Sequence, residues 1–205
     1  MSPQMVQRRA SNLTLILAAA TACLMAILGP VGAGTAQAAP EMVTFEQDYP
    51  LGAIVVVNQE RRLYYVIGKN RALRYPVAIG RPGTQWTGQL FVASHAINPS
   101  WTPPESPGRT VPGGPGNPLG VRALYLGWTN YRIHGTNAPG SIGSAASHGC
   151  FRMLNADVTH LYSRVNIGAP VYVVNSLSSA VEAANLTATL NTTNPAKAIK
   201  KTRTQ

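Results

Sequence analysis

SHGCFR, at residues 147–152, is the stretch that says most about how this 205-residue chain folds. It places Cys150 two residues after His148, with a glycine between them. A thiol reacts as its thiolate, and a nearby imidazolium lowers the thiol pKa from its usual value of about 8.5. A second imidazole, His134, lies upstream in YRIHGT (residues 131–136), across a loop rich in Gly, Ser and Ala. This arrangement predicts a nucleophile and its base.

The first 38 residues have the pattern of a secretory signal peptide. Arg8 and Arg9 precede an apolar run at residues 13–28, and small residues then lead to AQA at 36–38, a typical cleavage site. The alternative is an uncleaved membrane anchor, but the length of the apolar run is near the lower limit for crossing a bilayer. We therefore expect cleavage, export to the periplasm or cell envelope, and no stable membrane span after processing.

Cleavage would leave Cys150 without a possible disulfide partner, because the other cysteine of the chain is Cys23. Exported proteins meet oxidising conditions, in which cysteines normally pair. A solitary thiol there favours a chemical role. The alternative is a buried structural cysteine, which fits poorly beside Gly149, since glycine indicates close approach of the backbone.

The processed chain would be strongly basic. Without Arg8 and Arg9 it has 15 Lys or Arg and 7 Asp or Glu, a formal charge of +8. The charges are scattered and carry no aromatic-basic recognition motif. We expect attraction to anionic envelope polymers and no nucleic-acid partner.

Short β-type runs separated by turns dominate the rest of the chain and predict a mainly β fold, an antiparallel-rich sheet or sandwich. One helix is indicated, with Asn155 as its N-cap and apolar residues at helical spacing before Gly168. A second short helix is conceivable at 180–190. The predicted organisation is a signal peptide (1–38), a linker (39–50), a catalytic domain (51–175) and a basic, flexible tail (176–205).

Three interpretations compete for His134, His148 and Cys150. The thiol can attack a carbonyl while an imidazole takes its proton and the amides of Gly149 and Cys150 receive the oxyanion. Two imidazoles and a thiolate can instead bind zinc, but ligands one residue apart depart from the usual spacings. The residues can also be structural. We favour acyl transfer and expect no metal and no cofactor.

Taken together, the upstream HGT (134–136), the small-residue loop and SHGCFRM (147–153) resemble the signature of bacterial L,D-transpeptidases of the YkuD type, the group that includes ErfK, YbiS, YcfS and YnhG. The resemblance covers about residues 51–174. It implies a β-sandwich catalytic domain in an exported enzyme that acts on peptidoglycan stem peptides. The family often has a proline before the Thr-Gly pair, where this chain has Trp86.

The resemblance also implies roles for the residues of the motif. Cys150 is the nucleophile, His134 accepts its proton, and the Gly135 carbonyl orients that imidazole. His148 shapes the surroundings of the thiol and the oxyanion pocket, although which imidazole is the base is left open. Three further residues are assigned to substrate binding and its support, namely Arg152, which can hold a stem-peptide carboxylate, Ser147 and Gly149.

The implied reaction forms a Cys150 thioester on the stem tetrapeptide, releases the terminal D-Ala and transfers the acyl group to an amine. The acceptor can be another stem peptide, an outer-membrane protein or a free D-amino acid. An L,D-carboxypeptidase would give the same acyl group to water, and a non-catalytic peptidoglycan-binding protein would keep only the fold. The sequence does not separate these outcomes.

Overall fold

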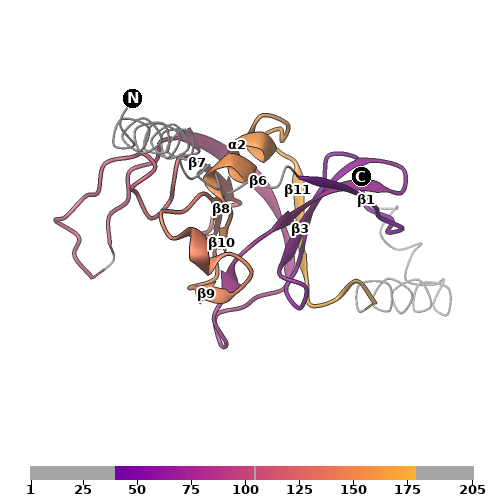
Figure 1. The fold of residues 1–205 in the computed structure, drawn as a ribbon, viewed down its shortest axis with the longest axis horizontal. Helices are drawn as coiled ribbons and strands as arrows, with labels where there is room; N and C mark the ends of the chain where they lie inside the picture. The colour runs from indigo at the N-terminus through magenta and orange to yellow at the C-terminus, as the bar shows by residue number, and fades with distance from the viewer. Residues whose placement is uncertain (1–39, 104, 179–205) are drawn as a thin grey trace, which may run out of the picture. The chain divides into compact units, whose positions relative to one another are not determined.

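The computed structural model describes residues 40–103 and 105–178, which contain eleven strands, the helix α2 and a short 3-10 helix, η1 (Pro139–Ser141) (Figure 1). Nine strands form one ordered series. From one edge to the other they are β1 (Glu41–Thr44), β4 (Arg71–Pro76), β3 (Arg62–Gly68), β2 (Ile54–Val57), β11 (Pro170–Val174), β6 (Gly88–Ile97), β7 (Arg122–Leu126), β8 (Arg132–His134) and β10 (Phe151–Arg152). A separate parallel pair joins β5 (Ile79–Gly80) and β9 (Ala145–Ser147).

Most of the pairings are antiparallel, and the mainly β prediction is confirmed. Two pairings in the large series are parallel: β11 with β2, and β10 with β8. The second of these matters for the site, because it brings the end of YRIHGT beside the end of SHGCFR. Parallel neighbours need a long connection between them, and here the connection is the segment from residue 135 to 150, which contains η1 and β9.

Strand β6 belongs to both halves of the series. Its first residues, from Gly88 to Phe91, pair with β11, and its later residues, from Val92 to Ile97, pair with β7. The register shifts between Val92 and Ser94, which marks a bulge at the change of partner. The strand therefore continues from the half of the series that contains β11 into the half that contains β7 (Figure 1).

Strand β2 is buried on both of its faces, each of which packs into a different apolar cluster. All four of its residues, IVVV, are fully buried. Ile54 and Val56 face the main core with residues of β7, β8 and α2, whereas Val55 and Val57 face a second cluster that includes Phe45 and Tyr64. Successive side chains of a strand point to opposite faces, so an unbroken apolar run is what a strand buried on both sides requires.

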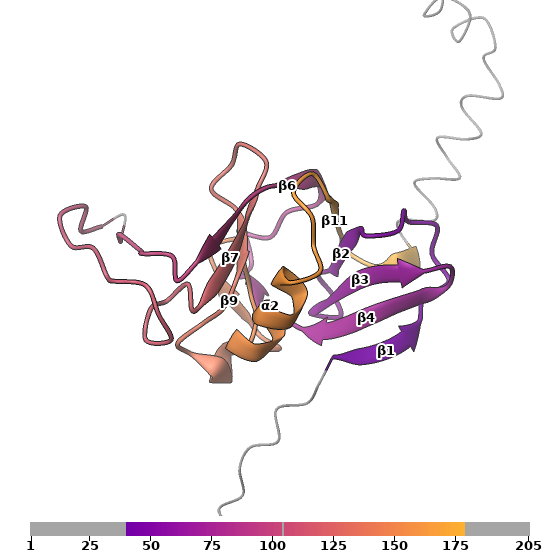
Figure 2. The same cartoon turned by 90° about the horizontal axis from the view of Figure 1, so that it is seen from above.

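Helix α2 (Asn155–Tyr162) packs Val158 and Leu161 into the main core. It packs against β7 and β8, and Figure 2 shows it next to β7. The predicted capping residue was wrong: the N-cap is Leu154, and Asn155 is the first helical residue. Its side-chain oxygen is turned away from the helix toward the amides of Val121 and Thr136.

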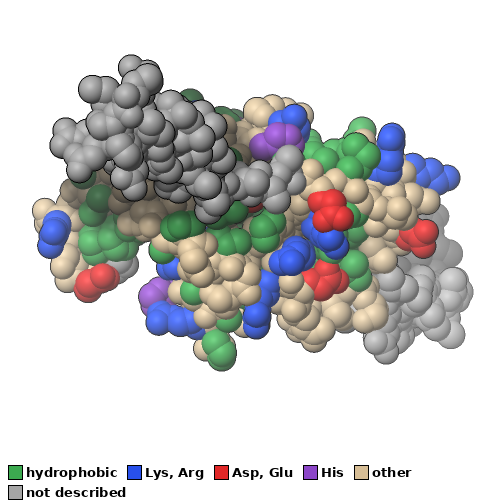
Figure 3. Space-filling view, in the orientation of Figure 1, with side chains coloured by type: hydrophobic (Ala, Val, Ile, Leu, Met, Phe, Trp, Pro, Cys, Tyr) green, Lys and Arg blue, Asp and Glu red, His purple; other side chains and the backbone are tan. Residues whose placement is uncertain are grey.

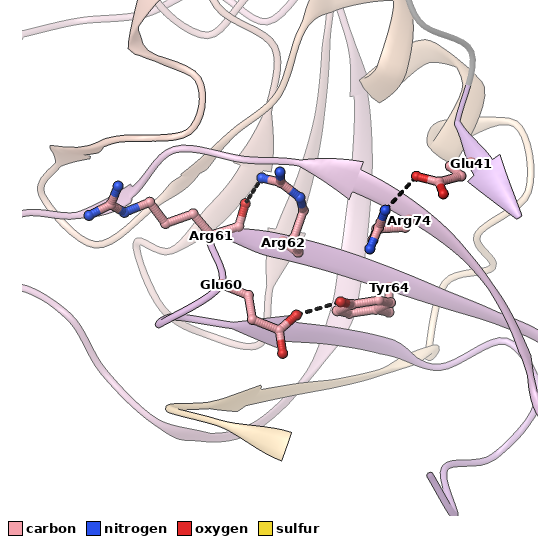
Figure 4. Close-up of polar contacts among 6 residues, drawn as sticks. All are labelled: Glu41, Glu60, Arg61, Arg62, Tyr64 and Arg74. Atoms are coloured by element: carbon pink, nitrogen blue, oxygen red, sulfur yellow. Dashed lines mark hydrogen bonds and ion pairs between the residues drawn. The ribbon is translucent and has the colours of Figure 1, made fainter. Parts of the chain in front are cut away.

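The predicted linker at residues 39–50 contains β1, which pairs antiparallel with β4. An ion pair of 2.5 Å between Glu41 and Arg74 joins the two strands, and Tyr64 donates to Glu60 nearby (Figure 4). Phe45 then packs against Tyr64, with ring centroids 4.7 Å apart. The short EMVT, with two apolar residues between two polar ones, gave no clear strand pattern, and the strand that it pairs with is distant in the sequence.

The predicted signal peptide, the second helix and nearly all of the basic tail lie outside the described residues. Within residues 40–103 and 105–178, no helix has the length and apolar character needed to cross a bilayer. Lys and Arg side chains are dispersed over the visible face and do not gather in a single patch (Figure 3).

Asp157 is a buried carboxyl on α2, and it supports a first prediction. It is 3% exposed, its Oδ2 has no hydrogen-bond partner among the described residues, and burial raises its pKa to about 6. The folded protein thus holds this proton more tightly than the unfolded chain, so stability falls as pH rises from about 4 to about 6. We expect Asp157→Asn to increase the free energy of unfolding at pH 7 by about 1–2 kcal/mol, less than the full linkage because a carboxylate in the first helical turn is favourable.

Urea denaturation of both proteins at pH 7 and pH 4 measures this effect. The gain should shrink to a few tenths of a kcal/mol at pH 4, where the carboxyl is protonated in the folded protein and about half protonated in the unfolded chain. A variant that is less stable than the parent at both pH values would contradict the prediction.

Candidate active site

The turn at residues 147–150 is closed by the side chain of Ser147. Its Oγ donates to the Cys150 carbonyl at 2.5 Å and accepts from the Gly149 amide at 3.0 Å. Ser147 is 2% exposed and also ends β9, which pairs with β5. Because the Gly149 amide and the Cys150 carbonyl are both bonded to this buried hydroxyl, the turn holds Cys150 in a defined position.

A side chain at position 149 would not fit. The backbone there has a φ of +112°, and a Cβ would lie 2.7 Å from Cε1 of Tyr131 and 3.1 Å from the Thr84 carbonyl oxygen. A positive φ is costly for residues with a Cβ. Gly149 therefore lets the turn pass directly against the Tyr131 ring, as its position beside the thiol suggested.

Cys150 directly precedes β10 and has a partly exposed free thiol. Its Sγ donates to the Asn130 carbonyl at 3.6 Å, a distance typical of weak thiol hydrogen bonds. None of the hydrogen bonds among the described residues joins the thiol to His134 or His148. The sulfur is thus accessible and weakly held.

His134 ends β8, at the level of Arg152 on the neighbouring strand β10. Residues in register on adjacent strands face the same side, and strand residues two apart also share a side. Cys150 directly precedes β10 and comes two residues before Arg152, so strand alternation continued by one residue would place its side chain on the side of His134. The parallel pairing brings His134 beside Arg152, which is 18 positions away in the sequence and two residues after Cys150.

The tautomer of His134 follows from its hydrogen bond. Nδ1 lies 2.6 Å from the Gly135 carbonyl oxygen, which can only accept, so Nδ1 carries the proton and Nε2 has the free lone pair. His134 is 4% exposed, and burial lowers its pKa to about 4. The hydrogen bond to Gly135 raises the pKa in part, while the charges of Arg152 and Arg132 lower it. The imidazole is therefore neutral at pH 7. It can accept a proton as a base, but it has no charge with which to stabilise a resting thiolate.

His148 has a different environment. It is exposed, and the Arg81 guanidinium donates to its Nε2. Arg81 also anchors the neighbouring backbone, since its amide donates to the Ser147 carbonyl at 2.9 Å. The imidazole of His148 is thus hydrogen-bonded to a surface arginine, and in the described part of the chain it makes no hydrogen bond to the thiol.

Two guanidinium groups lie on the side of His134. Arg152 is partly exposed and has no carboxylate partner among the described residues, where the only ion pair is that of Arg74 with Glu41. Arg132 lies over the ring of Tyr125, 5.1 Å from its centroid. The nearby positive charge makes this side suitable for an anionic ligand.

Asn155 supports the His134 segment, a role that the sequence reasoning missed by assigning it to the helix cap. Its Oδ1 accepts from the amides of Val121 (3.3 Å) and Thr136 (3.2 Å). A Cβ on Gly135 would lie 2.2 Å from that oxygen. Gly135 therefore contributes its carbonyl to His134 and the absence of a side chain to Asn155.

Metal binding has little support in this arrangement. Within the described part of the chain, no group of three or more His, Cys, Asp or Glu side chains is placed to hold a metal ion. The Nδ1 proton of His134 is donated to a carbonyl, and His148 accepts from Arg81. The two imidazoles thus do not converge with Cys150 on one point.

A profile for L,D-transpeptidase catalytic domains (YkuD) matches residues 52–173. The probable L,D-transpeptidase YbiS of Escherichia coli (strain K12) is 38% identical over 138 residues, 60% of this chain and 44% of that protein. The probable L,D-transpeptidase ErfK/SrfK of Salmonella typhimurium is 32% identical over 155 residues, 69% of this chain and 50% of that protein. The chain spans about half the length of these curated relatives.

Solved structures show the same fold at low sequence identity. The Ldtfm–avibactam carbamoyl enzyme superposes with a TM-score of 0.53 at 21% identity, over 62% of this chain and 50% of the other. A mutant of the Enterococcus faecium L,D-transpeptidase gives a TM-score of 0.50 at 20% identity, over 59% and 48%.

Proposed function

Because this chain belongs to the family of L,D-transpeptidase catalytic domains, we propose that it is a peptidoglycan L,D-transpeptidase with Cys150 as nucleophile and His134 as base. The observation that carries the proposal is the arrangement of these two residues. A partly exposed thiol directly precedes β10, and the parallel neighbour β8 carries, in register with Arg152, a neutral imidazole whose Nδ1 is bonded to the Gly135 carbonyl. Such a nucleophile, base and orienting group are what cysteine acyl transfer requires.

The first half of the reaction forms the thioester. The sulfur leaves the Asn130 carbonyl and attacks the carbonyl carbon of the third stem residue, while the thiol proton moves to Nε2 of His134. The carbonyl electron pair moves onto its oxygen. When the tetrahedral intermediate collapses, the bond to the nitrogen of the terminal D-Ala breaks, and that nitrogen takes the proton from His134.

The second half returns the enzyme to its starting state. An acceptor amine attacks the thioester carbonyl and gives its proton to His134, and the carbon–sulfur electron pair then returns to Cys150 with that proton. Arg152, near His134 and without a carboxylate partner in the described part of the chain, would bind a stem-peptide carboxylate. Ser147 and Gly149 would support the site by shaping the turn.

Mass spectrometry of the reduced protein incubated with tetrapeptide muropeptides tests the proposal. A Cys150 adduct that lacks D-Ala, followed by dimeric products, supports transpeptidation. An adduct that yields only tripeptide, with an acceptor amine present, assigns the protein as an L,D-carboxypeptidase. No adduct and no release of D-Ala would leave a non-catalytic, peptidoglycan-binding role and would overturn the proposal.

The site of action is also part of the proposal. The N-terminal pattern of residues 1–38 and the formal charge of +8 after its removal support export and retention near anionic envelope polymers. Cell fractionation with an antibody against the protein, combined with N-terminal sequencing, measures both points. A cytosolic protein that begins at Met1 would contradict this part.

The pKa of His134 predicts the acid side of the pH profile. Protonated imidazole cannot accept the thiol proton, and burial places this protonation at a pH of about 4. We expect kcat/KM for acylation to fall at low pH and to reach half of its neutral value near pH 4. This midpoint is well below the usual histidine pKa of about 6.5. Stopped-flow acylation between pH 3.5 and 8 measures it, with circular dichroism as a check of folding. A midpoint near 6.5 would show that His134 is hydrated in the reacting conformation.

A further inference from the structure

Trp86 makes a direct hydrogen bond to the turn that carries the nucleophile. Its indole Nε1 donates to the Gly149 carbonyl at 2.9 Å. The ring is held on both sides, stacked on Tyr131 with centroids 4.6 Å apart and tilted against Phe151 at 5.6 Å. Its backbone is held too, because Nδ2 of Asn58 donates to the Trp86 carbonyl at 3.0 Å. The indole N–H is thus fixed in place before any substrate binds.

The Gly149 carbonyl and the Cys150 amide belong to the same peptide plane. No peptide bond in the described residues is cis, so the N–H of Cys150 points away from the Gly149 oxygen. A hydrogen bond that holds this oxygen on the Trp86 side therefore directs the Cys150 N–H to the opposite side. A hydrogen bond accepted by the carbonyl also polarises the amide and strengthens its N–H as a donor.

The two amides expected to receive the oxyanion differ in availability. The Gly149 amide donates to Ser147 Oγ at 3.0 Å and is already used. The Cys150 amide has no acceptor among the residues that the structure describes. A free amide next to the sulfur is the donor that an oxyanion hole needs.

We propose that Trp86 is a positioning residue that orients the Cys150 amide as an oxyanion donor. This inference rests on the proposed acyl transfer and adds a residue to it. As the sulfur bonds to the carbonyl carbon, the electron pair moves onto the carbonyl oxygen, and the Cys150 N–H donates to that oxygen. Trp86 acts through the Gly149–Cys150 peptide, to which its indole N–H is bonded.

Trp86→Phe tests the inference, because phenylalanine keeps an aromatic ring and lacks the N–H. Two reagents separate the oxyanion from the sulfur. With 4-nitrophenyl acetate, the sulfur bonds to the acetyl carbon, 4-nitrophenolate leaves, and an oxyanion forms on the way. With iodoacetamide, the sulfur displaces iodide from a saturated carbon, and no oxyanion forms. We expect acetylation to fall about tenfold, less than the 10²–10³-fold cost of deleting an oxyanion donor, and alkylation to change less than about twofold.

Trp128→Phe is the matched control, since this indole is 93% exposed, packs against Phe91 and, in the described part of the chain, makes no hydrogen bond to residues 147–150. Both of its rates should equal those of the parent. Benzothienylalanine at position 86 keeps the bicyclic ring and replaces the N–H by sulfur, so it gives the same test if the phenylalanine variant folds poorly. It should reproduce the selective loss.

Two results would overturn the inference: acetylation at the parent rate, or equal losses of acetylation and alkylation, which would mean that Trp86 acts on the sulfur or on the fold. Failure of the proposed function gives a different result. In that case the parent protein would react with 4-nitrophenyl acetate and not with the tetrapeptide, and the comparison of the two position-86 variants with the parent would still decide the role of Trp86.

Discussion

Cys150→Ser is expected to abolish formation of the acyl-enzyme and to reduce D-Ala release by at least about 10³-fold. Serine has nearly the same shape, but its hydroxyl loses a proton far less readily than a thiol, and a neutral imidazole is a weak base for it. The structure predicts that folding will be unaffected. The thiol is partly exposed and makes one weak hydrogen bond, to the Asn130 carbonyl, which a serine hydroxyl can also make.

Intact-mass spectrometry and D-Ala quantification with the tetrapeptide measure this loss, and thermal unfolding shows whether the fold is retained. A second nucleophile would be revealed if the serine variant released D-Ala at a rate within about tenfold of the parent. In that case the assignment of Cys150 would be wrong.

His134→Asn is expected to reduce kcat/KM for acylation by about 10²–10⁴-fold, the usual contribution of a general base. The asparagine amide can occupy the place of Nδ1 and donate to the Gly135 carbonyl, so the substitution removes the Nε2 acceptor with little other change. The variant must then react through the small fraction of thiol that ionises by itself. Its rate should increase about tenfold for each pH unit up to the pKa of the thiol, usually about 8.5, whereas the parent should be nearly flat around neutral pH.

His148→Asn distinguishes the two imidazoles. Because His148 is exposed and accepts from Arg81, we expect its loss to cost less than about fivefold, far less than the loss of a base. Steady-state release of D-Ala from the tetrapeptide, measured for both variants over a range of pH, makes the comparison. If the His148 variant shows the larger loss and the steep pH dependence, the roles of the two residues are reversed.

Much of this site is held by residues outside the motif. Asn155 holds the His134 segment by accepting from Thr136, and Trp86 holds the Gly149 carbonyl. The first was predicted to cap a helix, and the second was noted as a departure from the family pattern. Neither role has a local signal, because each depends on a hydrogen bond to a backbone group distant in the sequence.

The sequence by itself determined the fold class and the chemical candidates. Runs such as IVVV at 54–57 predict strands because their side chains must be buried, and SHGC at 147–150 indicates a reactive thiol because one residue separates it from an imidazole. These are local properties, which residue type and spacing express directly. The same locality explains why β1 and the start of α2 were misjudged, since both depend on distant partners.

The tertiary structure decided how the candidates relate to each other. Parallel pairing of β10 with β8 places His134 in register with Arg152, two residues after Cys150, while the contact with Arg81 engages His148, which is nearer to the thiol in sequence. Burial keeps the His134 imidazole neutral, so that its Nε2 is free to accept a proton. The physical reason is that orientation and desolvation arise from groups that meet only in the folded chain, whereas reactivity belongs to the residues themselves.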